Sequence, residues 1–212
     1  MKSPNTELPK SLAGFEHIRR RWDRSQQRVT AKILPGEFYV TRHNEVIDTV
    51  LGSCIAACVR DPVNGIGGMN HFMLPETSRD RLANGCPSIV GTATRYGNYA
   101  MEHLINTILQ HGGQRRNLEV KVFGGGKIIP AVTDIGLRNI DFVLDYIHTE
   151  GLELTSKDLG GVYPRKVLYF PNEGRVRVKK LANINGDTIV TRELKYREEI
   201  ENAPVEGEIE LF

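Results

Sequence analysis

The most apolar part of the chain lies between residues 50 and 75 and predicts a hairpin of two buried strands. The run from Cys54 to Val59 is too short to cross a bilayer and is typical of a buried strand. A turn follows at Asp61-Pro-Val-Asn-Gly65, where proline fixes φ and the Asn-Gly pair tolerates positive φ. Antiparallel pairing across this turn would bring His71, in the second apolar run, back toward Cys54.

The rest of the pattern predicts two helices and several more strands. Apolar residues recur at helical spacing over residues 92–111 and 139–150, and a glycine follows each segment. Short apolar or alternating runs predict strands at 38–40, 46–47, 118–123, 152–159, 166–170 and 175–181. Strands with two helices in this order favour an α/β (α+β layered) single domain, with mixed or antiparallel strands covered by the two helices.

The two ends of the chain differ from this pattern and from each other. Residues 1–35 form a basic N-terminal extension, in which 15–32 has apolar residues at helical spacing and predicts either a basic helix or a loosely held arm. Residues 36–182 make up the predicted domain. Residues 183–212 are polar, become acidic from Glu198 onward, and predict a flexible C-terminal tail.

Composition narrows the class of protein only modestly. The chain has 212 residues, enough for one good core, and its formal charge of +2 gives no general case for binding nucleic acid. Its three cysteines are odd in number and lack metal-ligand spacing, so we expect neither a disulfide framework nor a zinc site. The polar start of the chain has no secretory h-region, and we expect a reducing cytoplasm and no membrane insertion.

Cys54 and His71 are the candidate chemistry of the predicted hairpin. A thiol is a weak nucleophile at neutral pH, and a neighbouring imidazole activates it by taking its proton. Gly52 and Ser53 come directly before Cys54 and would let the backbone turn sharply, presenting amides as an oxyanion hole. The alternative is a structural cysteine, because free cysteine is among the most buried residue types.

Several further blocks of sequence favour the catalytic interpretation. They are Leu51-Gly-Ser-Cys54, Asp61-Pro62, Gly68-Met-Asn-His-Phe-Met-Leu-Pro75, Arg95-Tyr-Gly97, Phe123-Gly-Gly-Gly126, Asp158-Leu-Gly-Gly161 and Pro164-Arg-Lys-Val167. In this order and spacing, over about residues 36 to 181, the chain resembles the chemoreceptor glutamine deamidase family (CheD). The resemblance implies a cytoplasmic chemotaxis enzyme that converts glutamines of methyl-accepting receptors into glutamates. It also implies a core similar to that of the cytotoxic necrotizing factor toxins.

The resemblance assigns roles to individual residues. It implies that Cys54 is the nucleophile and His71 the general base and acid. The family's third member is a threonine six positions before the cysteine, where this chain has Asp48 with Thr49 beside it. Strand parity favours Asp48 and a carboxylate would stabilise an imidazolium well, but Gly52 can break parity and the family uses a hydroxyl, so both stay candidates with Thr49 preferred.

Further expectations concern the substrate site and its partners. Asn70, Gly124 and Gly125 are candidates for the substrate groove, and the polar loop at 76–88, which contains Cys86, would lie beside it. The chemistry needs no metal and no organic cofactor. A non-catalytic binding module for chemoreceptors or for a CheC-type phosphatase, as some family members are, is the alternative function. A different amidohydrolase with the same Cys-His pair is a third.

Overall fold

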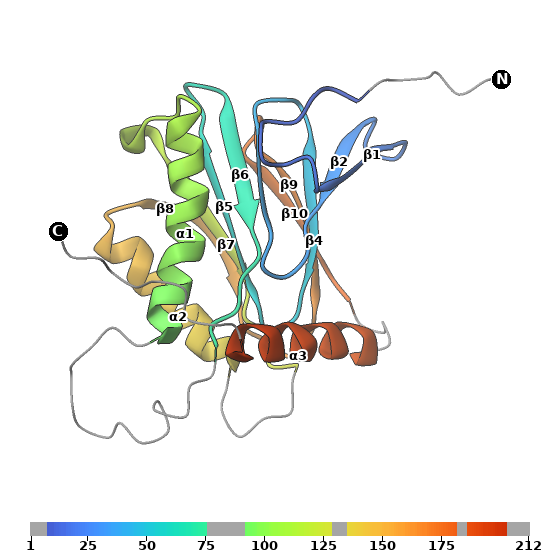
Figure 1. Ribbon diagram of the computed structural model, residues 1–212, viewed down its shortest axis with the longest axis vertical. Coiled ribbons are helices and arrows are strands. Elements are labelled where there is room, and N and C mark those ends of the chain that lie inside the picture. The colour runs from blue at the N-terminus through green and yellow to red at the C-terminus, as the bar shows by residue number, and fades with distance from the viewer. Residues whose placement is uncertain (1–7, 76–91, 129–134, 182–185, 203–212) are drawn as a thin grey trace.

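The computed structural model describes residues 8–75, 92–128, 135–181 and 186–202 (Figure 1). Within these ranges the chain forms ten strands and three α-helices. Their bounds are β1 Arg19–Asp23, β2 Arg28–Lys32, β3 Phe38–Thr41, β4 Val46–Leu51, β5 Ile55–Asp61, β6 Ile66–Asn70, α1 Thr92–Gln110, β7 Glu119–Gly124, α2 Ile135–Thr149, β8 Glu153–Leu159, β9 Arg165–Phe170, β10 Arg175–Lys180 and α3 Gly186–Asn202.

The strands form two mixed five-stranded sheets. The first sheet has the order β1-β2-β4-β9-β10 and the second the order β3-β6-β5-β7-β8. Pairing is antiparallel except for β2 with β4 and β7 with β8. The predicted α/β layered domain with mixed strands is confirmed, because each expected strand and both expected helices are present.

The elements form layers around one core (Figure 1). Helices α1 and α2 cover one face of the second sheet, and the first sheet lies on its other face. Buried side chains of both sheets join the same cluster, for example Ile47 and Tyr169 from the first sheet and Ala57 and Met69 from the second. Helix α3 lies across the ends of the strands, where the chain passes from β4 to β5. None of the described helices is long and apolar enough to cross a membrane.

The predicted hairpin is formed by β5 and β6. The two strands pair from Asp61 with Ile66 to Cys58 with Met69, and a further bridge joins Ile55 to Phe72. The Asp61 carboxylate holds the turn by accepting hydrogen bonds from the amides of Val63 and Asn64 and from the amide of Gln114. Burial opposes charge on Asp61, but hydrogen bonds from the side chain and amide of Asn64 and from the Gln114 amide outweigh it and lower the pKa of the carboxyl to about 2.

The two alternatives for residues 15–32, a basic helix and a loosely held arm, are both wrong. This segment forms β1 and β2, which pair with each other, and β2 then pairs in parallel with β4. Gln27, with a φ of 51°, turns the chain between the two strands. The apolar residues Phe15 and Ile18 are buried before β1 begins, so their helical spacing reflects core contacts and not a helix.

The flexible tail expected from residue 183 onward is also corrected in part, because residues 186–202 form α3. The helix is polar overall, yet Ile189, Glu193 and Tyr196 are buried against the rest of the protein. Their spacing of four and three residues places them on one helix face. A helix with only this narrow buried stripe resembles a polar tail in its sequence.

Candidate active site

The turn that carries Cys54 connects the two sheets. Strand β4 ends at Leu51 in the first sheet and β5 begins at Ile55 in the second, so residues 52–54 cross between them. Three hydrogen bonds fix this turn: the Gly126 amide donates to the Gly52 carbonyl at 2.7 Å, the Gly125 amide to the Cys54 carbonyl at 2.8 Å, and the Asn139 side-chain amide to the Ser53 carbonyl at 2.8 Å. The backbone around Cys54 is therefore preorganised.

The glycines at the end of β7 pack against this turn. Gly124 and Gly125 have φ values of 115° and 65°, a region that favours glycine. A Cβ on Gly124 would lie 2.1 Å from the Cys54 carbonyl oxygen, and one on Gly125 would meet Ile140. Both glycines are buried, so the structure places these groove candidates beneath the cysteine turn.

His71 follows β6 and is bound on both sides of its peptide. Its amide donates to the Glu37 carbonyl at 2.9 Å, and its carbonyl accepts from the Gly36 amide at 2.8 Å. The ring Nδ1 lies 2.8 Å from the Thr49 hydroxyl oxygen, and that hydroxyl also donates to the Ile33 carbonyl at 2.9 Å. Because the single hydroxyl hydrogen points to Ile33, Thr49 must accept from Nδ1–H.

This network fixes the tautomer of His71. With the proton on Nδ1, the lone pair is on Nε2, and Nε2 is buried without a hydrogen-bond partner among the described residues. A buried imidazole nitrogen with a free lone pair is suited to take a proton from a nearby thiol. The hydroxyl of Thr49 thus orients the ring, and none of the described carboxylates is hydrogen bonded to it.

The Asp48 side chain contacts Lys166 and not His71. Adjacent residues of a strand point to opposite faces, and the Asp48 carboxylate is 3.2 Å from the Lys166 ammonium. The alternation of side chains along one strand cannot be counted from Cys54 back to Asp48. Strands β4 and β5 belong to different sheets, and the turn at residues 52–54 changes which face each position occupies. Of the two candidates for the third position, only Thr49 contacts His71 in the structure.

Two asparagines brace the segments on either side of the site. Asn139, at the start of α2, donates to the Ser53 carbonyl and accepts from the Leu74 amide at 2.9 Å, so it connects the cysteine turn to the segment after His71. Asn70 accepts from the Ala57 amide and donates to the carbonyl of Ala100, which joins the hairpin to α1. Asn139 had no sequence signal beyond its place at the start of a predicted helix.

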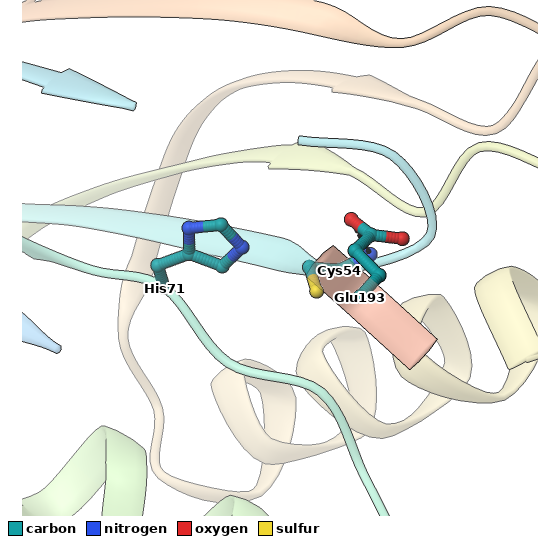
Figure 2. Close-up of side chains that lie close together, drawn as sticks. All are labelled: Cys54, His71 and Glu193. Carbon is teal, nitrogen blue, oxygen red and sulfur yellow. Dashed lines mark hydrogen bonds between the residues drawn. The ribbon is translucent and has the colours of Figure 1, made fainter. Parts of the chain in front are cut away.

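Glu193 of α3 is the site residue that sequence reasoning missed. One carboxylate oxygen accepts hydrogen bonds from the amides of Gly52 at 2.7 Å and Cys54 at 3.4 Å. The other accepts from the Ser53 amide at 2.8 Å and the Ser53 hydroxyl at 2.7 Å. Figure 2 shows Cys54 between the His71 ring and this carboxylate. Three amides that converge on one anionic group form the arrangement of an oxyanion hole.

Three titratable side chains lie close together at the site. The Cys54 sulfur, a His71 ring nitrogen and a Glu193 oxygen all lie within 4.8 Å of one another. Burial, and then the charge and hydrogen bond of Glu193, raise the pKa of the Cys54 thiol well above its ordinary value. Burial, and then Arg192, lower the pKa of His71 to about 3. With Glu193 in place, the site therefore holds a neutral thiol beside a neutral imidazole.

The same trio is a possible metal ligand set by residue type, since thiolate, imidazole and carboxylate all bind zinc. Both Glu193 oxygens already accept N–H or O–H bonds, so a cation would compete with the amides for them. A cavity of about 120 Å³ lies next to His71 and is lined by Gly36, Asn70 and Tyr96 among others. The predicted loop at 76–88, with Cys86, lies outside the described residues, and Cys58 is buried in β5.

Comparisons with known proteins identify the family. Residues 73–180 match the family described as CheD chemotactic sensory transduction. A probable chemoreceptor glutamine deamidase CheD of Halorhodospira halophila is 58% identical over 206 residues, which are 97% of this chain and 94% of that protein. Proteins with the same description from Hydrogenovibrio crunogenus and Hahella chejuensis are 57% and 49% identical, over 86% and 96% of this chain and over 94% and 95% of their own lengths.

Proposed function

Because the chain belongs to the chemoreceptor glutamine deamidase (CheD) family, we propose that it hydrolyses glutamine side chains of methyl-accepting chemotaxis receptors to glutamates and ammonia. One observation carries the proposal to this chain. Three backbone amides converge on a carboxylate within 4.8 Å of the Cys54 sulfur, and a ring nitrogen of the buried His71 lies within the same distance. Among the described residues, Nε2 of this ring has no hydrogen-bond partner. A nucleophile, a base and an oxyanion hole are what acyl transfer requires.

The proposed reaction has two steps. His71 Nε2 takes the thiol proton, and the Cys54 sulfur attacks the carboxamide carbon while the amides of residues 52–54 stabilise the oxyanion. The C–N bond then breaks, the imidazolium protonates the departing ammonia, and a thioester remains. In the second step His71 activates water, which hydrolyses the thioester to a glutamate and restores the thiol. Thr49 keeps Nδ1 protonated throughout.

The family membership also supports proposals on setting and partners. We place the enzyme in the cytoplasm, with receptors as protein substrates and a CheC-type phosphatase as a further partner. The chemistry described needs no cofactor, because every proton transfer runs through Cys54 and His71. We propose that Asp48, Gly124 and Gly125 support the fold around the site through their contacts with Lys166 and the cysteine turn, and that Asn70, which lines the cavity beside His71, also contributes to the substrate groove.

The test is mass spectrometry of a receptor cytoplasmic fragment incubated with the full-length protein or with Cys54→Ala. We expect specific glutamines to gain the mass difference between a carboxamide and a carboxylate with the unaltered protein only. Free glutamine and peptide bonds in the same mixture should remain intact, which separates this activity from that of a general amidohydrolase. Receptor binding without any mass change would favour the non-catalytic binding module instead.

A further inference from the structure

Helix α3 contacts the candidate site through one narrow stripe. Glu193 is at its centre and is only 1% exposed, with Ile189 one turn before it and Tyr196 about one turn after it. The Tyr196 hydroxyl is hydrogen bonded to the Tyr96 hydroxyl of α1, and its ring lies so close to Gly36 that a Cβ there would be 2.9 Å from it. Anchors at these spacings are how a helix docks in a groove.

The Glu193 carboxylate has no cation partner among the described residues, as is also true of the buried Asp61 carboxylate, but the donors to Glu193 flank the candidate nucleophile. Buried carboxylates are usually paired with a cation, because removing their charge from water is costly. Within the described part of the chain, Glu193 is held instead by the amides and hydroxyl of residues 52–54, beside the sulfur. Gly52 permits this approach, since a Cβ there would lie 2.8 Å from a Glu193 oxygen.

Glutamate is also the product of the reaction proposed above. It has the same chain length as glutamine and differs only in having oxygen where glutamine has an amide nitrogen. Glu193 therefore offers the site a side chain with the shape of the reacting residue, carried on a helix. No other described carboxylate contacts the residue 52–54 amides.

We propose that α3 occupies the substrate groove as a built-in product analogue, with Glu193 in the subsite for the reacting glutamine. This inference rests on the proposed function and adds two things to it. The substrate glutamine is presented on an α-helix that docks along the surface now covered by α3. The enzyme in this conformation is self-blocked, so a receptor helix must displace α3 before reaction.

The sharpest test replaces the carboxylate by the substrate's own functional group. In Glu193→Gln the carboxamide oxygen can keep the bonds from the Gly52 and Cys54 amides, and the carboxamide nitrogen would lie beside Ser53, whose hydroxyl can rotate to accept from it. Attack on the carboxamide carbon would expel ammonia, and hydrolysis of the thioester would regenerate the original glutamate. Intact-mass and peptide analysis of the purified variant should show this reversion or the ammonia-loss thioester. The double variant Glu193→Gln with Cys54→Ala should keep the carboxamide, and persistence of the carboxamide when Cys54 is present overturns the proposal.

A second measurement does not depend on turnover. Glu193→Ala removes the anion that disfavours a thiolate, so a neutral alkylating reagent at pH 7.5 should label Cys54 about tenfold faster than in the unaltered protein. The matched control is Glu199→Ala on the same helix, an exposed residue paired with Lys195, and its labelling rate should not change. Equal labelling rates for both variants and the unaltered protein would contradict the self-blocked site.

Receptor deamidation separates this inference from the proposed function. If α3 blocks the groove, Glu193→Ala should deamidate a receptor fragment several-fold faster than the unaltered protein, and it should still require Cys54. Cys54-dependent deamidation that is not accelerated by Glu193→Ala would leave the deamidase function standing and overturn the role of α3. Absence of deamidation in every folded variant would overturn the proposed function itself.

Discussion

The two ends of the chain meet the same site and act on it in opposite ways. The N-terminal segment extends the first sheet through β2, and its Ile33 carbonyl accepts the Thr49 hydrogen that fixes the His71 tautomer. The C-terminal helix places Glu193 against the amides of residues 52–54 and contributes a charge that disfavours the thiolate. The N-terminal segment thus supplies a contact that the site needs, whereas the C-terminal helix fills the space beside Cys54.

The difference follows from how each end is attached. The N-terminal segment is held by backbone pairing and by the buried Arg20–Glu45 ion pair, whose carboxylate also accepts from the Tyr39 hydroxyl at 2.7 Å. Helix α3 has no backbone pairing with the sheets and is held by a few side chains. Sheet pairing can be removed only by unfolding, whereas a helix held by side chains can be exchanged for another helix.

Removing the anchor of the N-terminal segment should have the largest effect. Glu45→Ala leaves the Arg20 guanidinium and the Tyr39 hydroxyl without their partner in a buried setting, so we expect a loss of about 3 kcal/mol in the free energy of unfolding. Urea denaturation measures this. Glu173→Ala, which breaks partly exposed pairs with Arg28 and Arg175, is the control and should change the unfolding free energy little. Similar losses in both variants would refute a special role for the Glu45 anchor.

The next effect tests the contribution of the first sheet to chemistry. Thr49→Val keeps the shape of the side chain but removes the acceptor for Nδ1–H, so we expect kcat to fall by about 10- to 100-fold with folding intact. Thr49→Ser should restore most of the activity. Asp48→Asn, next to it but directed at Lys166, should keep most of it. A larger loss in Asp48→Asn than in Thr49→Val would reverse the assignment of the third residue.

The stability of the protein should also depend on pH through His71. Its pKa is lowered to about 3 by burial and by Arg192, so between this value and its ordinary value near 6.5 the unfolded chain binds a proton that the folded chain does not. Stability should thus decline as pH falls below about 6.5, by up to about 1.4 kcal/mol per pH unit from this group.

Urea titrations at pH 7.5 and 5 check this expectation. His71→Gln should remove this share of the decline. Glu193→Ala should reduce it, because loosening α3 returns water to the imidazole. An identical pH dependence in all three proteins would show that His71 titrates normally in the folded state.

The smallest effect concerns the outer contact of α3. Tyr196→Phe removes the hydroxyl bonded to Tyr96 and leaves the Glu193 contacts in place, which should weaken helix docking by about 1 kcal/mol. Alkylation of Cys54 should then be about fivefold faster, less than the increase for Glu193→Ala. If Cys54 is alkylated faster in Tyr196→Phe than in Glu193→Ala, the helix is held by the tyrosine pair and not by the carboxylate.

Much of the fold and part of the site could be predicted from local sequence. The Asp61 to Gly65 turn fixes the hairpin that returns His71 toward Cys54, because its turn chemistry and flanking apolar runs agree. The candidate pair and the adjacent amides follow from the same stretch. By contrast, the choice between Asp48 and Thr49 could not be made by counting positions, since the two strands involved belong to different sheets.

The sequence alone determined the hairpin, the two covering helices and the family, since each depends on short-range pattern or on matched blocks of residues. Only the tertiary structure decided that residues 19–32 pair as strands, that Asn139 braces the cysteine turn, and that Glu193 binds the amides of residues 52–54. The physical reason is the separation along the sequence between the residues that interact. Helix periodicity and turn chemistry act over a few residues, whereas the contacts of Asn139 with Ser53 and of Glu193 with Gly52 join positions 86 and 141 residues apart and carry no local signal of their partner.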